Sequence, residues 1–177
     1  ALSFNGNKIV TTGGGGAVVL ADPDLGRLLK HLSTTAKLPH QWEYVHDMVG
    51  FNYRLPNINA ALGCAQLEQL EGFIRAKRTL FDRYSRALTG LDGIRLLREP
   101  PDSRSNYWLQ TLIFDEEQDL SAVLGRFHER GIGARPLWKP LHQLPMYSSN
   151  PRGHMTVTDS LARRVVNLPS GVGVAEA

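Results

Sequence analysis

The stretch Ser3-Phe4-Asn5-Gly6-Asn7-Lys8-Ile9-Val10-Thr11-Thr12-Gly13-Gly14-Gly15-Gly16 places a lysine on a short segment that ends in a run of glycines. A lysine on a loop is most often a solvated, charged side chain. On a loop that can approach a carbonyl compound, however, an uncharged lysine amine is a nucleophile that can form a Schiff base. Lys8 is therefore the first candidate catalytic residue.

The glycine run does not match the common phosphate-binding motifs. Gly16 is followed by Ala17, Val18 and Val19, so the chain lacks both the Gly-Lys-Ser/Thr ending of a P-loop and the last glycine of G-x-G-x-x-G. Several glycines still permit positive φ and a close approach of the backbone to a bulky group. Ser3 could offer its hydroxyl to a phosphate, whereas the plainer interpretation of the run is a turn before a strand.

Further motifs follow the lysine stretch in order along the chain. Taken with the stretch from Ser3 to Gly16, they resemble the DegT/DnrJ/EryC1/StrS family of sugar aminotransferases. The resemblance is closest to the branch that makes 4-amino-4,6-dideoxy sugars from nucleotide-linked 4-keto sugars, such as the bacillosamine and legionaminic acid pathway enzymes. The motifs are Gly50-Phe51-Asn52-Tyr53-Arg54-Leu55-Pro56-Asn57, Ala60-Ala61-Leu62-Gly63-Cys64-Ala65-Gln66-Leu67, Arg135-Pro136-Leu137-Trp138-Lys139-Pro140-Leu141-His142 and Asn167-Leu168-Pro169.

This resemblance implies an α/β chain with the PLP-dependent transferase fold type I, which is aspartate-aminotransferase-like. Residues 1–57 would be the end of the PLP-binding large domain, with the Schiff-base lysine loop and a dimer loop. Residues 58–177 would be a long connecting helix and the small C-terminal α/β domain. The family uses about twice the 177 residues given, so we expect a carboxy-terminal half. The aspartate and the aromatic residue that hold the cofactor ring in the family would then lie outside it.

The resemblance also implies a reaction and a cofactor. Lys8 would carry pyridoxal 5′-phosphate (PLP) and move the proton during transamination of a nucleotide-linked 4-keto-6-deoxy sugar, with glutamate as the amino donor. Deoxygenating members of the family replace this lysine by histidine, so Lys8 favours transamination over dehydration. The alternative for the whole chain is a truncated, non-catalytic remnant or assembly module of such an aminotransferase.

Further site residues follow from the same resemblance, each beside a structural alternative. Ser3 would bind the PLP phosphate, and Asn52 would reach the phosphate of the neighbouring subunit, so a homodimer would share its active sites. Trp138 and His142 would contact the sugar nucleotide of the substrate, and Arg54 could pair with anionic groups of the substrate or of the cofactor. Taken alone, Asn52 reads as a turn residue, Arg54 as a structural ion pair, Trp138 as an interfacial aromatic and His142 as a surface histidine.

Composition favours a soluble globular protein, with 42% hydrophobic and 21% charged residues. The net charge of +3 fits an anionic nucleotide sugar or simply a mildly basic surface, and is too small to indicate nucleic-acid binding. The single cysteine, Cys64, excludes an internal disulfide and fits a reducing cytoplasm. Neither a membrane span nor a signal peptide is indicated by these residues, although a missing amino-terminal half could hold a targeting segment. We also expect no metal site, because the histidines lack metal-binding spacings.

Hydrophobic periodicity and capping residues divide the chain into short elements. Apolar residues recur at helical spacing over 57–88, which predicts one long helix or two helices joined near Gly72. Residues 33–56 are polar and irregular, and a loop of that length is usually functional or disordered. The residues expected on a solvated face of the long helix are Arg75, Arg78, Asp82 and Arg86. The other expected elements are strands at 17–20, 106–114 and 132–137, a surface loop at 136–145, and helices at 22–32, 119–131 and 158–166.

Overall fold

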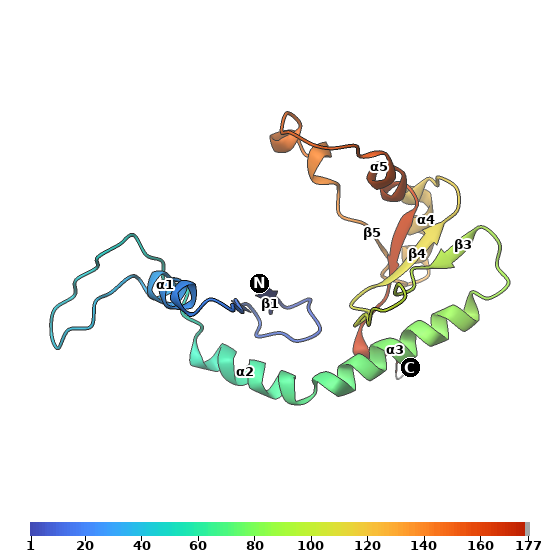
Figure 1. The fold of residues 1–177 in the computed structure, drawn as a ribbon. Helices are drawn as coiled ribbons and strands as arrows, with labels where there is room; N and C mark the ends of the chain where they lie inside the picture. Colours follow the sequence, from blue (N-terminus) through green and yellow to red (C-terminus); the bar gives the residue numbers. More distant parts are fainter. Residues whose placement is uncertain (176–177) are drawn as a thin grey trace. The chain divides into compact units, whose positions relative to one another are not determined.

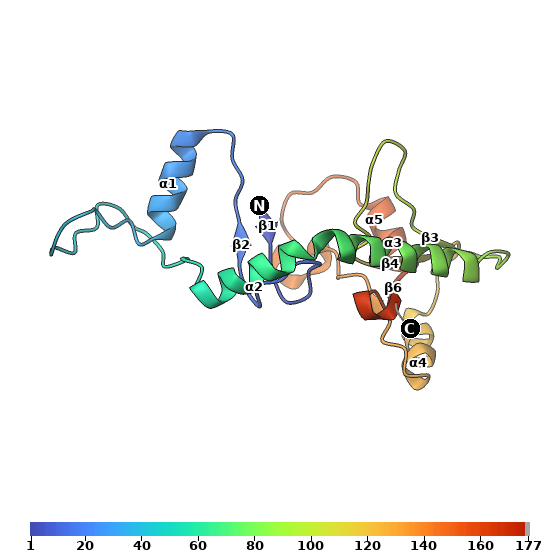
Figure 2. The same ribbon diagram turned by 90° about the horizontal axis from the view of Figure 1, so that it is seen from below.

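The computed structural model describes residues 1–175, and the chain divides into two compact units, Ala1–Glu71 and Gly72–Ala177 (Figures 1 and 2). The first unit contains β1 (Leu2–Ser3), β2 (Gly16–Ala17), α1 (Pro23–Ser33) and α2 (Asn57–Glu68). The second contains nearly all of α3 (Leu70–Ala87), then β3 (Ile94–Leu96), β4 (Gln110–Phe114), α4 (Leu120–Glu129), β5 (Arg135–Pro136), the 3-10 helices η1 (Leu141–Gln143) and η2 (Pro145–Tyr147), α5 (Thr156–Ala162), β6 (Val165–Leu168) and the 3-10 helix η3 (Val172–Ala175).

The first unit begins with a small antiparallel hairpin, in which Leu2 of β1 lies opposite Ala17 of β2. The predicted strand at 17–20 is wrong beyond Ala17 because β2 ends there. In the described part of the chain no strand pairs with Val18 or Val19, and both remain exposed. High β propensity does not make a strand without a neighbour that supplies the ladder hydrogen bonds.

The start of α1 follows the predicted capping pattern. The Asp22 side chain accepts hydrogen bonds from the backbone N–H groups of Asp24 and Leu25, and Pro23 occupies the first turn. These contacts satisfy N–H groups that have no partner inside the helix. The helix predicted to begin at this point is therefore confirmed.

The predicted 57–88 helix is two helices, α2 and α3, and their junction lies at Gln69. The Gln69 N–H bonds to the carbonyls of Gln66 and Leu67, which closes α2. Gly72 lies inside α3, where a single glycine is tolerated at a cost of about 1 kcal/mol relative to alanine. The expectation of a solvated face is wrong for Arg78, which is half-buried against Glu99.

The second unit is built on a four-stranded antiparallel sheet with the order β3-β4-β6-β5, and α3 lies along it (Figure 1). Leu80 and Phe81 of α3 are buried, and the Phe81 ring stacks on Tyr107 at 4.2 Å between centroids. All of β6 is buried. The core of this unit thus joins one face of α3 to the two central strands.

The helix predicted at 158–166 is wrong at its end, because α5 stops at Ala162 and Val165 and Val166 belong to β6. Val166 pairs with Leu112 of β4 on one side and with Pro136 of β5 on the other. A short apolar run that is buried between two strands favours β structure over continued helix. The strand predicted at 106–114 begins only at Gln110, and the strand predicted at 132–137 is reduced to β5.

Within residues 1–175, we find neither a helix long and apolar enough to cross a membrane nor a cluster of three or more acidic, histidine or cysteine side chains that could hold a metal ion.

Candidate functional site

Lys8 lies on the loop that connects β1 to β2, and backbone hydrogen bonds close this loop. The N–H of Phe4 donates to the Gly15 carbonyl at 2.9 Å, and the N–H of Thr12 donates back to the Phe4 carbonyl at 3.0 Å. The N–H of Lys8 donates to the Asn5 carbonyl at 3.0 Å, and Lys8 is half-buried. The lysine is therefore held on a short, closed loop.

Helix α2 supports the returning strand of this loop through Thr12, which is 2% exposed. The Asn59 side-chain amide donates to the Thr12 carbonyl at 2.5 Å, and the Thr12 hydroxyl donates to the Gly14 carbonyl at 2.9 Å. A Cβ added at Gly63 of α2 would lie 2.9 Å from the Thr12 methyl group. A glycine at position 63 is thus what allows the helix to pack this closely on the lysine loop.

Two members of the glycine run are required by the hairpin itself. A Cβ at Gly15, where φ is +156°, would lie 2.5 Å from the Thr12 hydroxyl, and a Cβ at Gly16 would lie 2.7 Å from the Leu2 carbonyl. Both contacts are too short for any real side chain. The run therefore permits close packing of the backbone in this loop, while Gly14 has open space around it.

Ser3 is exposed on β1, in the same hairpin as Lys8. Its hydroxyl oxygen accepts a hydrogen bond from the N–H of Asn5 at 3.4 Å, so its own O–H can donate to another group. An amine that can bond a carbonyl carbon and a hydroxyl that can bind a phosphate fit PLP. Ser3 and Lys8 thus lie on the same hairpin.

Residues 34–53 form a loop that leaves the end of α1 and returns to it (the 34–53 loop). Asn52 lies near the end of this loop, and Arg54 follows it directly. The N–H of Tyr53 donates to the Ser33 carbonyl at 2.9 Å, and Asn52 forms an isolated bridge with Thr34. Both Asn52 and Arg54 are exposed. The backbone of Asn52 and Tyr53 is therefore held at the end of α1, while the exposed side chains of Asn52 and Arg54 can meet a ligand or a partner.

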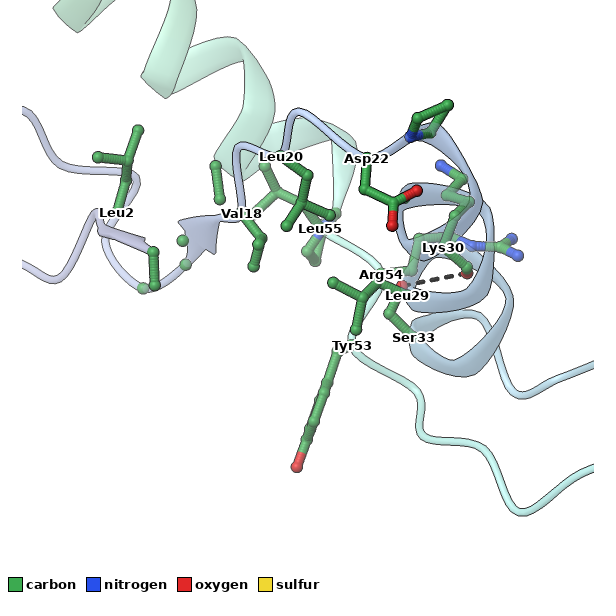
Figure 3. Close-up of a pocket in the computed structure, with 18 residues that line it drawn as sticks. Leu2, Val18, Leu20, Asp22, Leu29, Lys30, Ser33, Tyr53, Arg54 and Leu55 are labelled. Carbon is green, nitrogen blue, oxygen red and sulfur yellow. Dashed lines mark hydrogen bonds between the residues drawn. The ribbon is translucent and has the colours of Figure 1, made fainter.

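Arg54 lines a cleft of about 930 Å³ formed by α1, β2 and the segment before α2 (Figure 3). Apolar side chains make up much of its wall, and Arg54 and Lys30 add positive charge. Ser3 and Lys8 are not among the residues that line this cleft. The labelled apolar wall residues are Leu2, Val18, Leu20, Leu29 and Leu55.

Trp138 and His142 lie in the second unit. Trp138 is 66% exposed and stacks on Trp108, with ring centroids 5.9 Å apart and planes at 24°. His142, on η1, lines a second cleft, of about 540 Å³, and its Nε2 lies 2.8 Å from Oδ1 of Asp159 on α5. The hydrogen bonds from His142 and then from Gln143 hold the pKa of Asp159 below its ordinary value.

Sequence reasoning missed Asp159 as a partner of His142. The two residues are 17 positions apart and belong to different elements, and no motif links them. The packing of α5 against η1 creates the pair, so no local signal could have predicted it.

Comparisons with known proteins give one consistent family. The profile of the DegT/DnrJ/EryC1/StrS aminotransferase family matches residues 1–177. The "Putative pyridoxal phosphate-dependent aminotransferase EpsN" of Bacillus subtilis (strain 168) is 42% identical over 180 residues, which cover 98% of this chain and 46% of that protein. GDP-perosamine synthase of Escherichia coli O157:H7 is 36% identical over 168 residues, covering 95% and 45%.

A solved structure agrees with these relatives. The aminotransferase TlmJ from Streptoalloteichus hindustanus matches with a TM-score of 0.89 at 26% identity, over 97% of this chain and 46% of that chain. The predicted fold class, an α/β portion of fold type I, is thereby confirmed. The chain spans about half the length of the curated relatives it matches.

Proposed function

Because the chain belongs to the DegT/DnrJ/EryC1/StrS aminotransferase family, we propose that the full-length protein converts a nucleotide-linked 4-keto-6-deoxy sugar to the 4-amino sugar, with PLP as cofactor and glutamate as amino donor. The observation that carries the proposal is Lys8, held on the closed β1–β2 loop at the lysine of the family motif. The name of the GDP-perosamine synthase relative supports a nucleotide-linked sugar as substrate.

Lys8 and Ser3 have distinct roles in this proposal. PLP, when bound, supplies an electron sink for the carbon that loses its proton. Nζ of Lys8 would hold the cofactor and, once released, would act as the base and acid that moves that proton. The hydroxyl of Ser3 would donate to the cofactor phosphate, because its oxygen already accepts from the Asn5 N–H.

The 34–53 loop supports a homodimer. It projects from the end of α1 in both views (Figures 1 and 2). The N–H of Leu38 donates to the Val45 carbonyl at 2.8 Å, and the Lys37 ammonium lies 4.0 Å from the centre of the Tyr44 ring. Contacts within the 34–53 loop therefore hold its two arms together. Its large apolar side chains are nevertheless exposed: Trp42 69%, Tyr44 79%, Val49 86%, Phe51 51% and Tyr53 76%.

Several large apolar side chains exposed on one loop are typical of an interaction site. The proposed occupant is a second copy of the chain, onto which the loop would carry Asn52. Its side-chain amide would then reach the phosphate bound to the partner. In the second unit, Trp138 and His142 would contact the nucleotide sugar, and Arg54 would pair with its anionic groups. The exposed thiol of Cys64 favours a reducing compartment, and we place the protein in the cytoplasm.

A borohydride experiment tests the proposal most directly. The full-length protein would be reduced with borohydride and digested, and its peptides would be weighed by mass spectrometry. We expect the mass of PLP on the peptide that contains Lys8, with the peptides that contain Lys30 and Lys139 unmodified as internal controls. Lys8→Ala should lose both the adduct and transamination while keeping its circular dichroism spectrum.

Two outcomes would contradict the proposal. Transamination that survives in Lys8→Ala would remove the lysine from its role. A full-length protein that retains no PLP would instead favour the alternative of a non-catalytic assembly module.

A further inference from the structure

One carboxylate ties α5 to two consecutive side chains of η1. Oδ1 of Asp159 lies 2.8 Å from Nε2 of His142 and accepts a hydrogen bond from the Gln143 amide at 2.7 Å. The His142 side chain is only 15% exposed, while that of Asp159 is 34% exposed. The pair therefore sits at the edge of the second unit's packed part, where solvent screens it incompletely.

The carboxylate determines which nitrogen of His142 carries a proton. Its two bonds keep the pKa of Asp159 below the ordinary value, so this group is ionised at neutral pH. An ionised carboxylate can only accept, and Nε2 of His142 must therefore be the donor. In the neutral ring, the lone pair then lies on Nδ1.

The remaining nitrogen is the one that can serve a ligand. His142 lines the cleft of about 540 Å³ next to η1, together with Tyr147, Arg152 and Met155. Since Nε2 is engaged by Asp159, Nδ1 is the ring nitrogen that an occupant of this cleft can meet. A lone pair at that atom accepts a hydrogen bond from a hydroxyl, the most abundant polar group of a sugar.

We propose that Asp159 is a positioning residue for the sugar: it fixes His142 so that Nδ1 accepts a hydrogen bond from a sugar hydroxyl in the cleft beside η1. This proposal rests on the proposed function for the identity of the substrate. Asp159 itself does not touch the sugar and acts through His142, as a carboxylate that orients an imidazole does at metal and catalytic sites.

The first test reads the tautomer of His142 and needs neither cofactor nor activity. The full-length protein would be labelled with [15N]histidine, and the spectrum of His142→Gln would assign the resonances of His142. We expect protonated Nε2 and unprotonated Nδ1 in the wild type and a mixture of tautomers in Asp159→Leu. Asp92→Asn, which removes an exposed turn carboxylate, should leave the His142 signals unchanged. An unchanged tautomer in Asp159→Leu would overturn the proposal.

The second test separates positioning from a purely structural role by measuring the two half-reactions of transamination. Asp159→Leu should weaken the half-reaction with the nucleotide sugar about 10- to 100-fold, the range for removing an outer carboxylate that orients a functional imidazole. The half-reaction with glutamate should be unchanged, since His142 serves only the sugar. Asp159→Asn, which keeps an oxygen acceptor of the same shape, should recover most of the loss.

The outcomes of the second test distinguish this proposal from the function on which it rests. An equal loss of rate in both half-reactions of Asp159→Leu would mean that Asp159 only holds α5 and η1 together, and it would overturn the positioning role. A wild-type protein that transaminates no nucleotide sugar would overturn the proposed function. In that case the tautomer measurement still decides whether Asp159 fixes His142.

Discussion

Glu99 shows at the scale of a single residue how one carboxylate can organise a loop. Its two oxygens accept from Arg78 of α3 at 2.6 and 3.0 Å, and Oε2 also accepts from the N–H of Ser105 at 2.6 Å. These bonds, the Arg78 bond first, lower the pKa of Glu99 from its ordinary 4.5 to about 2. The folded chain thus stabilises the ionised form of Glu99.

The stabilisation that Glu99 contributes to the folded chain depends on pH. Because the folded pKa lies below the ordinary value, the stabilisation is complete above pH about 4.5 and is lost as the pH falls towards 2. We expect Glu99→Gln to be less stable than the wild type at pH 7, with the difference shrinking steadily towards pH 3. Urea denaturation of both proteins at several pH values measures this. A difference that does not change with pH would contradict it.

At the scale of elements, the contact between α2 and the lysine loop depends on the absence of a side chain at Gly63. Alanine at a helical glycine normally stabilises by about 1 kcal/mol. At Gly63, however, the new methyl group would meet the Thr12 methyl at 2.9 Å, and Thr12 cannot rotate without breaking its bond to the Gly14 carbonyl. Overpacking typically costs about 1–3 kcal/mol, so we expect Gly63→Ala to be destabilising.

Gly125, in the middle of α4, is the matched control, because an added Cβ there would meet nothing within 4 Å apart from its chain neighbours and the backbone of α4 itself. Gly125→Ala should raise the free energy of unfolding by about 0.5–1 kcal/mol. In Gly63→Ala, the amide of Thr12, which bonds to the Phe4 carbonyl, should exchange its hydrogen faster than in the wild type. Slower exchange at Thr12 would show that the helix and the loop do not pack as described.

Elements with local causes could be predicted from the sequence. Asp22 and Asp119 both cap helices that the sequence places correctly, since a cap acts on N–H groups two and three residues away. The end of α5 could not be placed, because Val165 and Val166 become a strand only through their neighbours β4 and β5. Lys77 was missed for the same reason: it lies in a helical pattern, yet it is 6% exposed and donates to the carbonyls of Trp108 and Ser170.

At the scale of the whole chain, one part of the candidate site could be predicted from the sequence and another part could not. Ser3 and Lys8 are close in sequence and share a hairpin, and a contiguous motif could therefore point to both. His142 was named from its motif, but its partner Asp159 arises from tertiary packing. The family resemblance implies a dimer loop within residues 1–57, but the exposure of the apolar side chains of the 34–53 loop, which supports the proposed dimer, depends on the fold and could not be predicted from the sequence.

The exposed apolar side chains of the 34–53 loop allow a prediction about the assembly of the whole molecule. Val49 is 86% exposed at the foot of the 34–53 loop, and a carboxylate in its place would be buried without a partner in the proposed dimer. Desolvating a carboxylate without a partner costs several kcal/mol, so Val49→Asp should raise the dimer dissociation constant about tenfold or more. Val157→Asp is the matched control, because Val157 is a 73% exposed valine on α5. Sedimentation equilibrium of the full-length proteins measures both constants, and a Val49→Asp protein that dimerises as tightly as Val157→Asp would exclude this loop from the interface.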